Sequence, residues 1–112
     1  MRELIVKPHW YQLIASGDKT IEARVNYDSL HNIKFGQVIH FICEGQCTEV
    51  TVTDIRNYST LENMLENEEI SKLLPGIQTF QDALLIYQSI YTEDTIHREK
   101  GMIVFAFIRN RV

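Results

Sequence analysis

An unbroken apolar run near the carboxyl terminus constrains the fold most. Residues 102–108 read Met-Ile-Val-Phe-Ala-Phe-Ile, so an extended segment there would be apolar on both of its faces. Strands of this kind lie inside a sheet that is covered on both sides. Gly101 stands directly before the run and would end a preceding helix. The sequence therefore predicts a central strand of a closed or well-covered sheet over these residues.

Other segments have the patterns of shorter strands and helices. We expect strands over residues 3–6, 20–25, 38–43 and 48–54, the last continuing toward residue 58, because apolar and polar residues alternate or form short apolar runs there. Helices are expected over residues 9–16, 61–66, 69–74, 80–90 and 93–97. Pro8 and Gly17 bound the first helix, and Thr79 and Thr92 are hydroxyl caps for the last two.

Length and composition indicate one domain. A chain of 112 residues rarely divides into two cores, and 45% hydrophobic with 23% charged residues is ordinary for a globular protein, so we assign residues 1–112 to a single domain. Five or six strands mixed with short helices predict a small α+β barrel. No apolar run is long enough to span a bilayer and no signal segment opens the chain, so we expect a cytoplasmic protein without a membrane partner.

The segment that carries the chemistry is residues 17–24, Gly-Asp-Lys-Thr-Ile-Glu-Ala-Arg. A turn at Gly17 is followed by a strand with a period of two, whose apolar face is Ile21, Ala23 and Val25. Its polar face carries Thr20, Glu22 and Arg24, with Lys19 at the start. Neighbours on one face lie roughly 6.5–7 Å apart, so Glu22 and Arg24 can pair or can hold one small ligand together. The alternative is the solvated face of an ordinary antiparallel strand.

Aromatic and acidic residues outside this segment have simpler interpretations. Trp10 lies on the apolar face of its helix and is expected in the core, whereas Tyr11 and Tyr27 fit either a core or a stacking surface for a base. The acidic stretch 62–69 is expected to be a solvated helix face.

The two cysteines and the charge narrow the function classes. Cys43 and Cys47 flank a tight turn that permits a disulfide, but the lack of a secretion signal favours reduced thiols. Together with His40 they supply only three ligands, and structural zinc takes four, so we expect no metal and no cofactor. The net charge of −4 argues against broad, nonspecific binding of nucleic acid.

The order of these elements resembles a known family. Gly17-x-Lys19-x-x-Glu22-x-Arg24, behind a short helix and before a turn and two strands, is similar to the ASCH domain (activating signal cointegrator homology) of the PUA-like superfamily. Further similarities are Lys7-Pro8-x-x-Tyr11-x-x-Ile14, Ile33-x-x-Gly36-x-x-Ile39 and the carboxyl-terminal Tyr91-Thr92-x(8)-Gly101-x-Ile103-x-Phe105. They cover essentially the whole chain.

The resemblance implies a fold and a site. It implies a small PUA-like β-barrel of five to six mostly antiparallel strands with short peripheral helices, and a cleft beside residues 17–24 that takes RNA or a nucleotide-like ligand. Some relatives are acetylcytidine amidohydrolases or ribonuclease-like enzymes. In the amidohydrolases the motif supplies a catalytic Lys and, three residues later, a Thr; Lys19 matches the Lys, but Glu22 stands at the position of the Thr.

Three functions remain open on these residues. In a binding module, Arg24 holds a phosphate or a base edge and Glu22 orients it, with Thr20, Gly17, Lys7 and Tyr27 as further ligand contacts.

In a hydrolase of modified nucleosides or RNA, Lys19 and Glu22 form an acid/base pair whose pKa values burial moves toward neutrality, and Arg24 stabilises an oxyanion. The third function is a module that binds a protein partner and has no small-molecule site.

Overall fold

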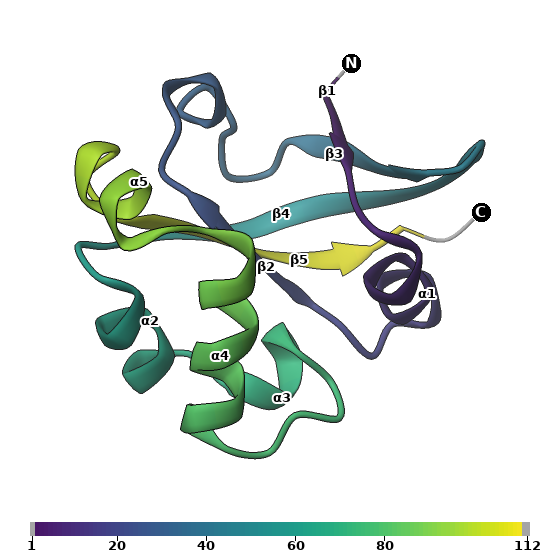
Figure 1. Ribbon diagram of the computed structural model, residues 1–112. Coiled ribbons are helices and arrows are strands. Elements are labelled where there is room, and N and C mark those ends of the chain that lie inside the picture. Colours follow the sequence, from purple (N-terminus) through teal and green to yellow (C-terminus); the bar gives the residue numbers. More distant parts are fainter. Residues whose placement is uncertain (1, 111–112) are drawn as a thin grey trace.

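A five-stranded sheet and several short helices make up the computed structural model, which describes residues 2–110 (Figure 1). The strands are β1 (Arg2–Ile5), β2 (Ile21–Val25), β3 (Val38–Cys43), β4 (Gln46–Tyr58) and β5 (Met102–Arg109), in the spatial order β1-β3-β4-β5-β2. The apolar run thus forms β5, which pairs with β4 on one side and β2 on the other. This confirms the predicted position of the run inside the sheet.

The sheet is mixed, which corrects the expected barrel of mostly antiparallel strands. β1 runs parallel to β3, whereas the β3–β4, β4–β5 and β5–β2 pairs are antiparallel. β1 and β2 are the two edges of the order and do not pair with each other. The sheet is therefore a strongly curled half-barrel with an open seam, the gap between the β1 and β2 edges.

A bulge in β4 helps the sheet curl. The pairing of β4 with β5 shifts register between Val52 and Asp54. A bulge bends its strand and increases the local twist. The extra residue also explains why Val50, Val52 and Ile55 are the inward apolar positions of β4, although their spacing is not a strict period of two.

The helices lie close to their expected positions. They are α1 (Pro8–Ser16), α2 (Leu61–Asn67), α3 (Ile70–Leu73), α4 (Phe80–Ile90) and α5 (Glu93–Arg98), with a short 3₁₀ turn η1 (Asp28–Leu30). Thr79 and Thr92 cap α4 and α5 by accepting from the backbone N–H groups of Asp82 and Thr95. No helix within residues 2–110 is long and apolar enough to cross a membrane.

Apolar side chains form a separate cluster on each face of the sheet. Inside the curl, Phe41, Ile103 and Phe105 pack with Tyr11 and Ile14 of α1. On the outer face, α2, α3 and α4 cover the sheet, as Figure 1 shows. The apolar face of β2 is buried as predicted, and it lies under these helices in a cluster that includes Ile21, Ala23, Val25, Leu73, Tyr87 and Val104. The polar residues Glu22 and Arg24 alternate with it along the strand.

The two cysteines are free thiols. Cys43 is buried, whereas Cys47 is exposed. Across the hairpin Cys47 pairs with Ile42 and Cys43 pairs with Gln46, so the two sulfurs lie on opposite faces of the sheet. This arrangement does not permit a disulfide without a register change, in agreement with the preference for reduced thiols.

Candidate functional site

The charged row on β2 is positioned by the end of α1. Gly17 ends α1 in the left-handed conformation at φ 90°, and its N–H donates to the Ile14 carbonyl at 3.1 Å. The Lys19 N–H then donates to the Leu13 carbonyl at 2.9 Å, which turns the chain back along α1. Lys19 consequently lies at the base of the strand that carries Glu22 and Arg24.

Lys19 is one of the most deeply buried side chains of the protein. It is 2% exposed, and its Nζ donates to the Ile21 carbonyl at 2.6 Å and to the Leu73 carbonyl, and lies 3.3 Å from Glu22 Oε1. Burial lowers the pKa of Lys19 from its ordinary value, while Glu22 opposes the shift. Because all three partners only accept hydrogen bonds, the arrangement fits an ammonium group with all its protons engaged.

Glu22 is buried between two cations. Its side chain contacts Lys19 through Oε1 and accepts from Arg24 Nε through Oε2 at 2.9 Å. Burial alone would raise the pKa of Glu22, but the charges of Lys19 and Arg24 outweigh it and hold the pKa below its usual value. The shift is opposite to the one expected for an acid/base catalyst near neutral pH, so Glu22 is a stable carboxylate.

Arg24 links the two edges of the open sheet. Its Nη2 donates to the Ile5 carbonyl at the end of β1 at 2.8 Å, while its Nε pairs with Glu22 on β2. One side chain therefore bridges the seam where backbone pairing between β1 and β2 is missing. The guanidinium is half-buried and held at a fixed orientation by two strands.

A cleft of about 190 Å³ lies at this seam. Lys19, Glu22 and Arg24 lie along its floor with Ala23, and Lys7 lies at its rim. Trp10 of α1 and Tyr87 and Tyr91 at the end of α4 form its aromatic walls. The cleft is smaller than the roughly 300–1,000 Å³ of typical drug-sized ligand sites, so it fits one ring system and not a whole nucleotide.

The predicted site residues divide into two groups. Lys19, Glu22, Arg24 and Lys7 meet in the seam cleft. Thr20 lines a different hollow, beside Arg56 and Lys72. Gly17 ends α1 and Tyr27 is exposed beyond β2, and within residues 2–110 neither lines the seam cleft.

The aromatic residues differ from their sequence interpretation. Trp10 is only partly buried, and its ring lies 5.8 Å from Lys19 Nζ at the wall of the cleft. Tyr11, its neighbour, is the core residue of α1 and accepts from the Thr48 hydroxyl at 2.9 Å. Tyr91 belongs to the carboxyl-terminal motif of the family resemblance, but nothing in the local sequence placed it in the site, because it reaches the cleft through the packing of α4 against β2.

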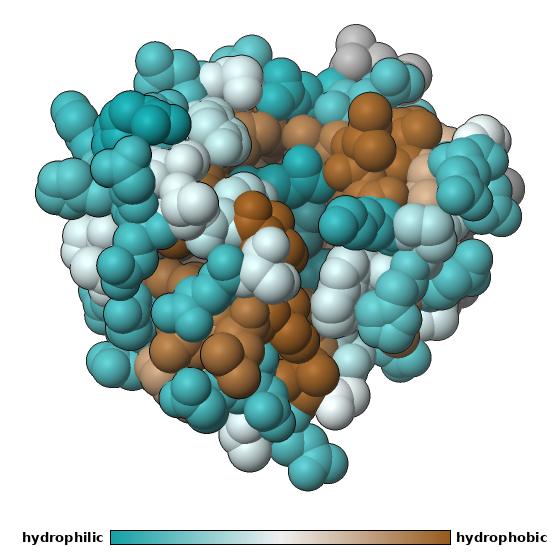
Figure 2. All heavy atoms as spheres, viewed as in Figure 1, coloured by the Kyte–Doolittle hydropathy of each residue, from teal (hydrophilic) through white to brown (hydrophobic). Residues whose placement is uncertain are grey.

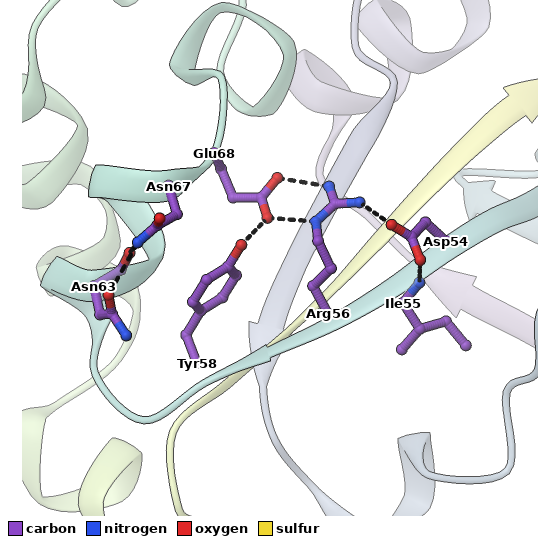
Figure 3. Close-up of polar contacts among 7 residues, drawn as sticks. All are labelled: Asp54, Ile55, Arg56, Tyr58, Asn63, Asn67 and Glu68. Atoms are coloured by element: carbon purple, nitrogen blue, oxygen red, sulfur yellow. Dashed lines mark hydrogen bonds and ion pairs between the residues drawn. The ribbon is translucent and has the colours of Figure 1, made fainter.

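The sequence did not predict a second polar cluster, which lies around Glu68 (Figure 3). Glu68 accepts from Arg56 Nε and Nη2, both at 2.6 Å, and from the Tyr58 hydroxyl at 2.5 Å. Arg56 Nη1 also donates to Asp54 at 2.7 Å. The expectation that residues 62–69 form a solvated face is therefore wrong for Glu68, which is buried and ties the α2–α3 junction to β4.

Two larger hollows fit an anionic ligand less well. One, of about 540 Å³, lies between α2 and the α4–α5 junction and carries Glu62, Glu93 and Asp94, whose charge repels anions. The other, of about 510 Å³, lies beside the Glu68 cluster, where Arg56 is already paired with two carboxylates. Within the described part of the chain, no three His, Cys, Asp or Glu side chains are placed to hold a metal ion.

The face shown in Figure 2 has apolar side chains in two groups, with hydrophilic side chains between them. One group lies over α4 and the other toward β1 and β3. Ile90 of α4 and Ile5 of β1 are exposed and line the seam cleft from opposite sides. The cleft thus has a charged floor and apolar rims.

Comparisons with known proteins give a consistent result. A family profile of the ASCH domain matches residues 4–107. The crystal structure of the hypothetical protein PH0355 is similar at 31% identity and a TM-score of 0.87, covering 98% of this chain and 100% of that one. The solution structure of protein PF0455 from Pyrococcus furiosus is similar at 28% identity and a TM-score of 0.78, covering 99% and 98%. No curated protein matches the chain.

Proposed function

This chain belongs to the ASCH domain family, and from that premise we propose that it binds RNA or a nucleotide-derived ligand in the seam cleft. Domains of this family are generally associated with RNA. The observation that carries the proposal is the convergence of Lys19, Glu22 and Arg24 on one hollow with aromatic walls. Aromatic rings stack on bases, for roughly 1–3 kcal/mol per base.

Arg24 is the residue through which the proposal is best tested. Its Nε and Nη2 are engaged, whereas Nη1 has no hydrogen-bond partner within residues 2–110 and is left to donate to a ligand. We expect short single-stranded RNAs or modified nucleosides to raise the melting temperature of the protein, because a ligand of the folded state stabilises it.

The matched variants are Arg24→Ala in the cleft and Arg98→Ala on the exposed face of α5. Arg24→Ala is expected to weaken binding at least about tenfold, which corresponds to about 1.4 kcal/mol. Arg98→Ala is expected to bind like the wild type. Equal loss in both variants would indicate nonspecific charge attraction and contradict the proposal. A lack of binding by every RNA and nucleotide tried would favour a partner-binding module instead.

A hydrolase acting on modified nucleosides or RNA is the second candidate. It is supported by a buried lysine of lowered pKa that lies 3.3 Å from a carboxylate. Catalysis by Lys19 would require it to give up one of its three acceptors, and Glu22 would have to accept a proton despite its lowered pKa. The test is product release from acylated cytidine by the wild type. Turnover that Lys19→Ala abolishes in a folded protein would favour the hydrolase.

A further inference from the structure

The backbone of β2 at the seam cleft restricts the class of ligand that the cleft can bind. Resting on the proposed function, we infer that the cleft binds the hydrogen-bonding edge of a planar ring, such as a nucleobase, through the free backbone N–H and C=O of Ala23. Any phosphate of the same ligand remains outside the cleft. Four observations support this assignment. They are the direction of the backbone groups of Ala23, the hydrogen bonds that the neighbouring residues of β2 already make, the ion pairs and hydrogen bonds that occupy Lys19 and Arg24, and the size of the cleft.

The backbone groups of Ala23 face the seam. In an antiparallel pair, alternate residues bond to the partner strand and the residues between them face away. The Phe107 N–H donates to the Thr20 carbonyl at 3.0 Å and the Asn26 N–H to the Gly101 carbonyl at 3.0 Å, so the even-numbered residues of this segment bond toward β5. Ala23 is opposite Val104 in this register, and its N–H and C=O therefore point to the free edge.

The carbonyls of the residues on either side of Ala23 along this edge, Ile21 and Val25, are already engaged. The Ile21 carbonyl accepts from Lys19 Nζ at 2.6 Å. The Val25 carbonyl accepts from the Tyr27 N–H at 2.7 Å. Of these three carbonyls along the edge, the one left open is consequently that of Ala23. A peptide strand needs several successive free residues to add to a sheet, so this edge suits a small ring better than a peptide.

The cations of the cleft are unsuited to a phosphate. Lys19 is engaged with two carbonyls and Glu22, and Arg24 with Glu22 and the Ile5 carbonyl, so that within residues 2–110 Arg24 Nη1 is the one donor left to a ligand. Glu22 offsets one of the two positive charges and so weakens their attraction for an anion. Lys7 is the exposed cation, and it lies at the rim. A nucleotide would therefore place its base inside and its phosphate near Lys7.

Size and wall chemistry agree with a ring. The cleft of about 190 Å³ has Trp10, Tyr87 and Tyr91 along its sides and Ala23 in its floor. Aromatic walls favour a flat π-system by stacking. A backbone donor and acceptor on the same residue match a ring that offers an acceptor and a donor on one edge.

The experiment is a calorimetric titration of the wild type with adenosine, cytidine, the forms of both nucleosides dimethylated on the exocyclic amine, ribose phosphate and inorganic phosphate. We expect the free nucleosides to bind, and the dimethylated forms to bind at least about tenfold more weakly because they lack the donor. Ribose phosphate and inorganic phosphate are expected not to bind. Equal binding of the dimethylated nucleosides would overturn the inference without any change to the protein.

A proline scan tests the backbone directly. Ala23→Pro replaces the N–H that faces the seam by a ring carbon and leaves the side chains of the cleft unchanged, and proline is tolerated at such edge positions. It is expected to lose at least about tenfold in affinity. Glu3→Pro is the control. The Val6 N–H bonds to the Ile42 carbonyl of β3, so the Glu3 N–H, three residues earlier and in the opposite phase, faces away from β3. Wild-type affinity of a folded Ala23→Pro variant would overturn the inference.

The binding experiments distinguish a failure of this inference from a failure of the proposed function. If RNA binds, nucleosides do not, and inorganic phosphate competes, the inference is overturned while RNA binding stands. If neither RNA nor any nucleotide or nucleoside binds, both are overturned.

Discussion

At the scale of single residues, Lys19 determines how the site is held together. Its ammonium group joins β2 to the last turn of α3 through the Leu73 carbonyl and neutralises Glu22. A charge so deeply buried is tolerated only with close partners, and removing one member of such a set leaves the others unpaired. Lys19 is therefore a structural residue as well as part of the site.

Lys19→Met tests this role because it keeps the length of the side chain and removes the charge. We expect it to lower the free energy of unfolding by about 3 kcal/mol, since Glu22 and two carbonyls lose their donor. Urea denaturation measures the change. Lys72→Met is the control: Lys72 is exposed, pairs with Glu69 at 3.6 Å, and should change stability by less than about 0.5 kcal/mol. Equal stability of the two variants would contradict the structural role.

Thiol reactivity tests the hairpin at the same scale. Cys47 is exposed, whereas Cys43 is buried, and burial raises the pKa of the Cys43 thiol. We expect a thiol-reactive dye to label the native protein in one fast phase that Cys47→Ser abolishes and Cys43→Ser leaves unchanged. A fast phase that depends on Cys43 would show that the hairpin register is different.

At the scale of elements, the junction between α5 and β5 depends on one glycine. Gly101 has φ 110°, and a Cβ added there would lie 1.9 Å from the Tyr58 carbonyl oxygen on β4. The chain thus passes directly against the end of β4 before it enters the sheet as β5.

Gly101→Ala is expected to lower the free energy of unfolding by more than about 3 kcal/mol, since backbone on both strands must move. Gly36→Ala is the matched control, with a positive φ of 82° and no heavy atom within 4 Å of the added Cβ. Its cost should be that of the left-handed conformation alone, about 1–2 kcal/mol. Chemical denaturation distinguishes the two, and similar losses would contradict the close approach.

Local sequence signals predicted where helices and strands begin better than they predicted which elements pack or pair with each other. Thr79 and Thr92 marked the starts of α4 and α5 because a cap is a contact within a few residues of sequence. The parallel direction of β1 was not predictable, since it depends on the pairing of Arg2–Ile5 with a strand that begins at Val38. The same limit explains why Glu68 was taken for a surface residue: its partner Arg56 lies on a different element.

The candidate site was predictable to a similar extent. The period of two correctly predicted that Ile21, Ala23 and Val25 share a buried face of β2. The row of Lys19, Glu22 and Arg24 followed from the same pattern. The aromatic walls did not, because the contribution of Tyr91 arises from the packing of α4 against an edge strand.

At the scale of the whole molecule, acid should weaken the fold through Glu22. Its folded pKa lies below its ordinary value of 4.5. A carboxyl group with a depressed pKa stabilises the folded state above its ordinary pKa, and this contribution is lost as pH falls through the folded pKa. The carboxylate therefore contributes fully near neutral pH and least in strong acid.

The pH dependence of Glu22→Gln measures this contribution. We expect the variant to be less stable than the wild type by about 2 kcal/mol at neutral pH. The difference should persist down to about pH 4.5 and shrink below it, as protonation of Glu22 makes the wild type resemble the amide. Urea denaturation at a series of pH values gives the two curves. A difference in the free energy of unfolding that grows as the pH falls would contradict a lowered pKa of Glu22.

Ligand binding at the seam is the central claim, and an amide NMR titration with a short single-stranded RNA tests it most directly. We expect the largest shifts at the cleft, on the amides of Ala23 and Arg24 and on the indole N–H of Trp10. Residues such as Ser59 and Asp94, which line the acidic hollow, should shift little. Shifts centred on that hollow, or no shifts at all at saturating RNA, would contradict it.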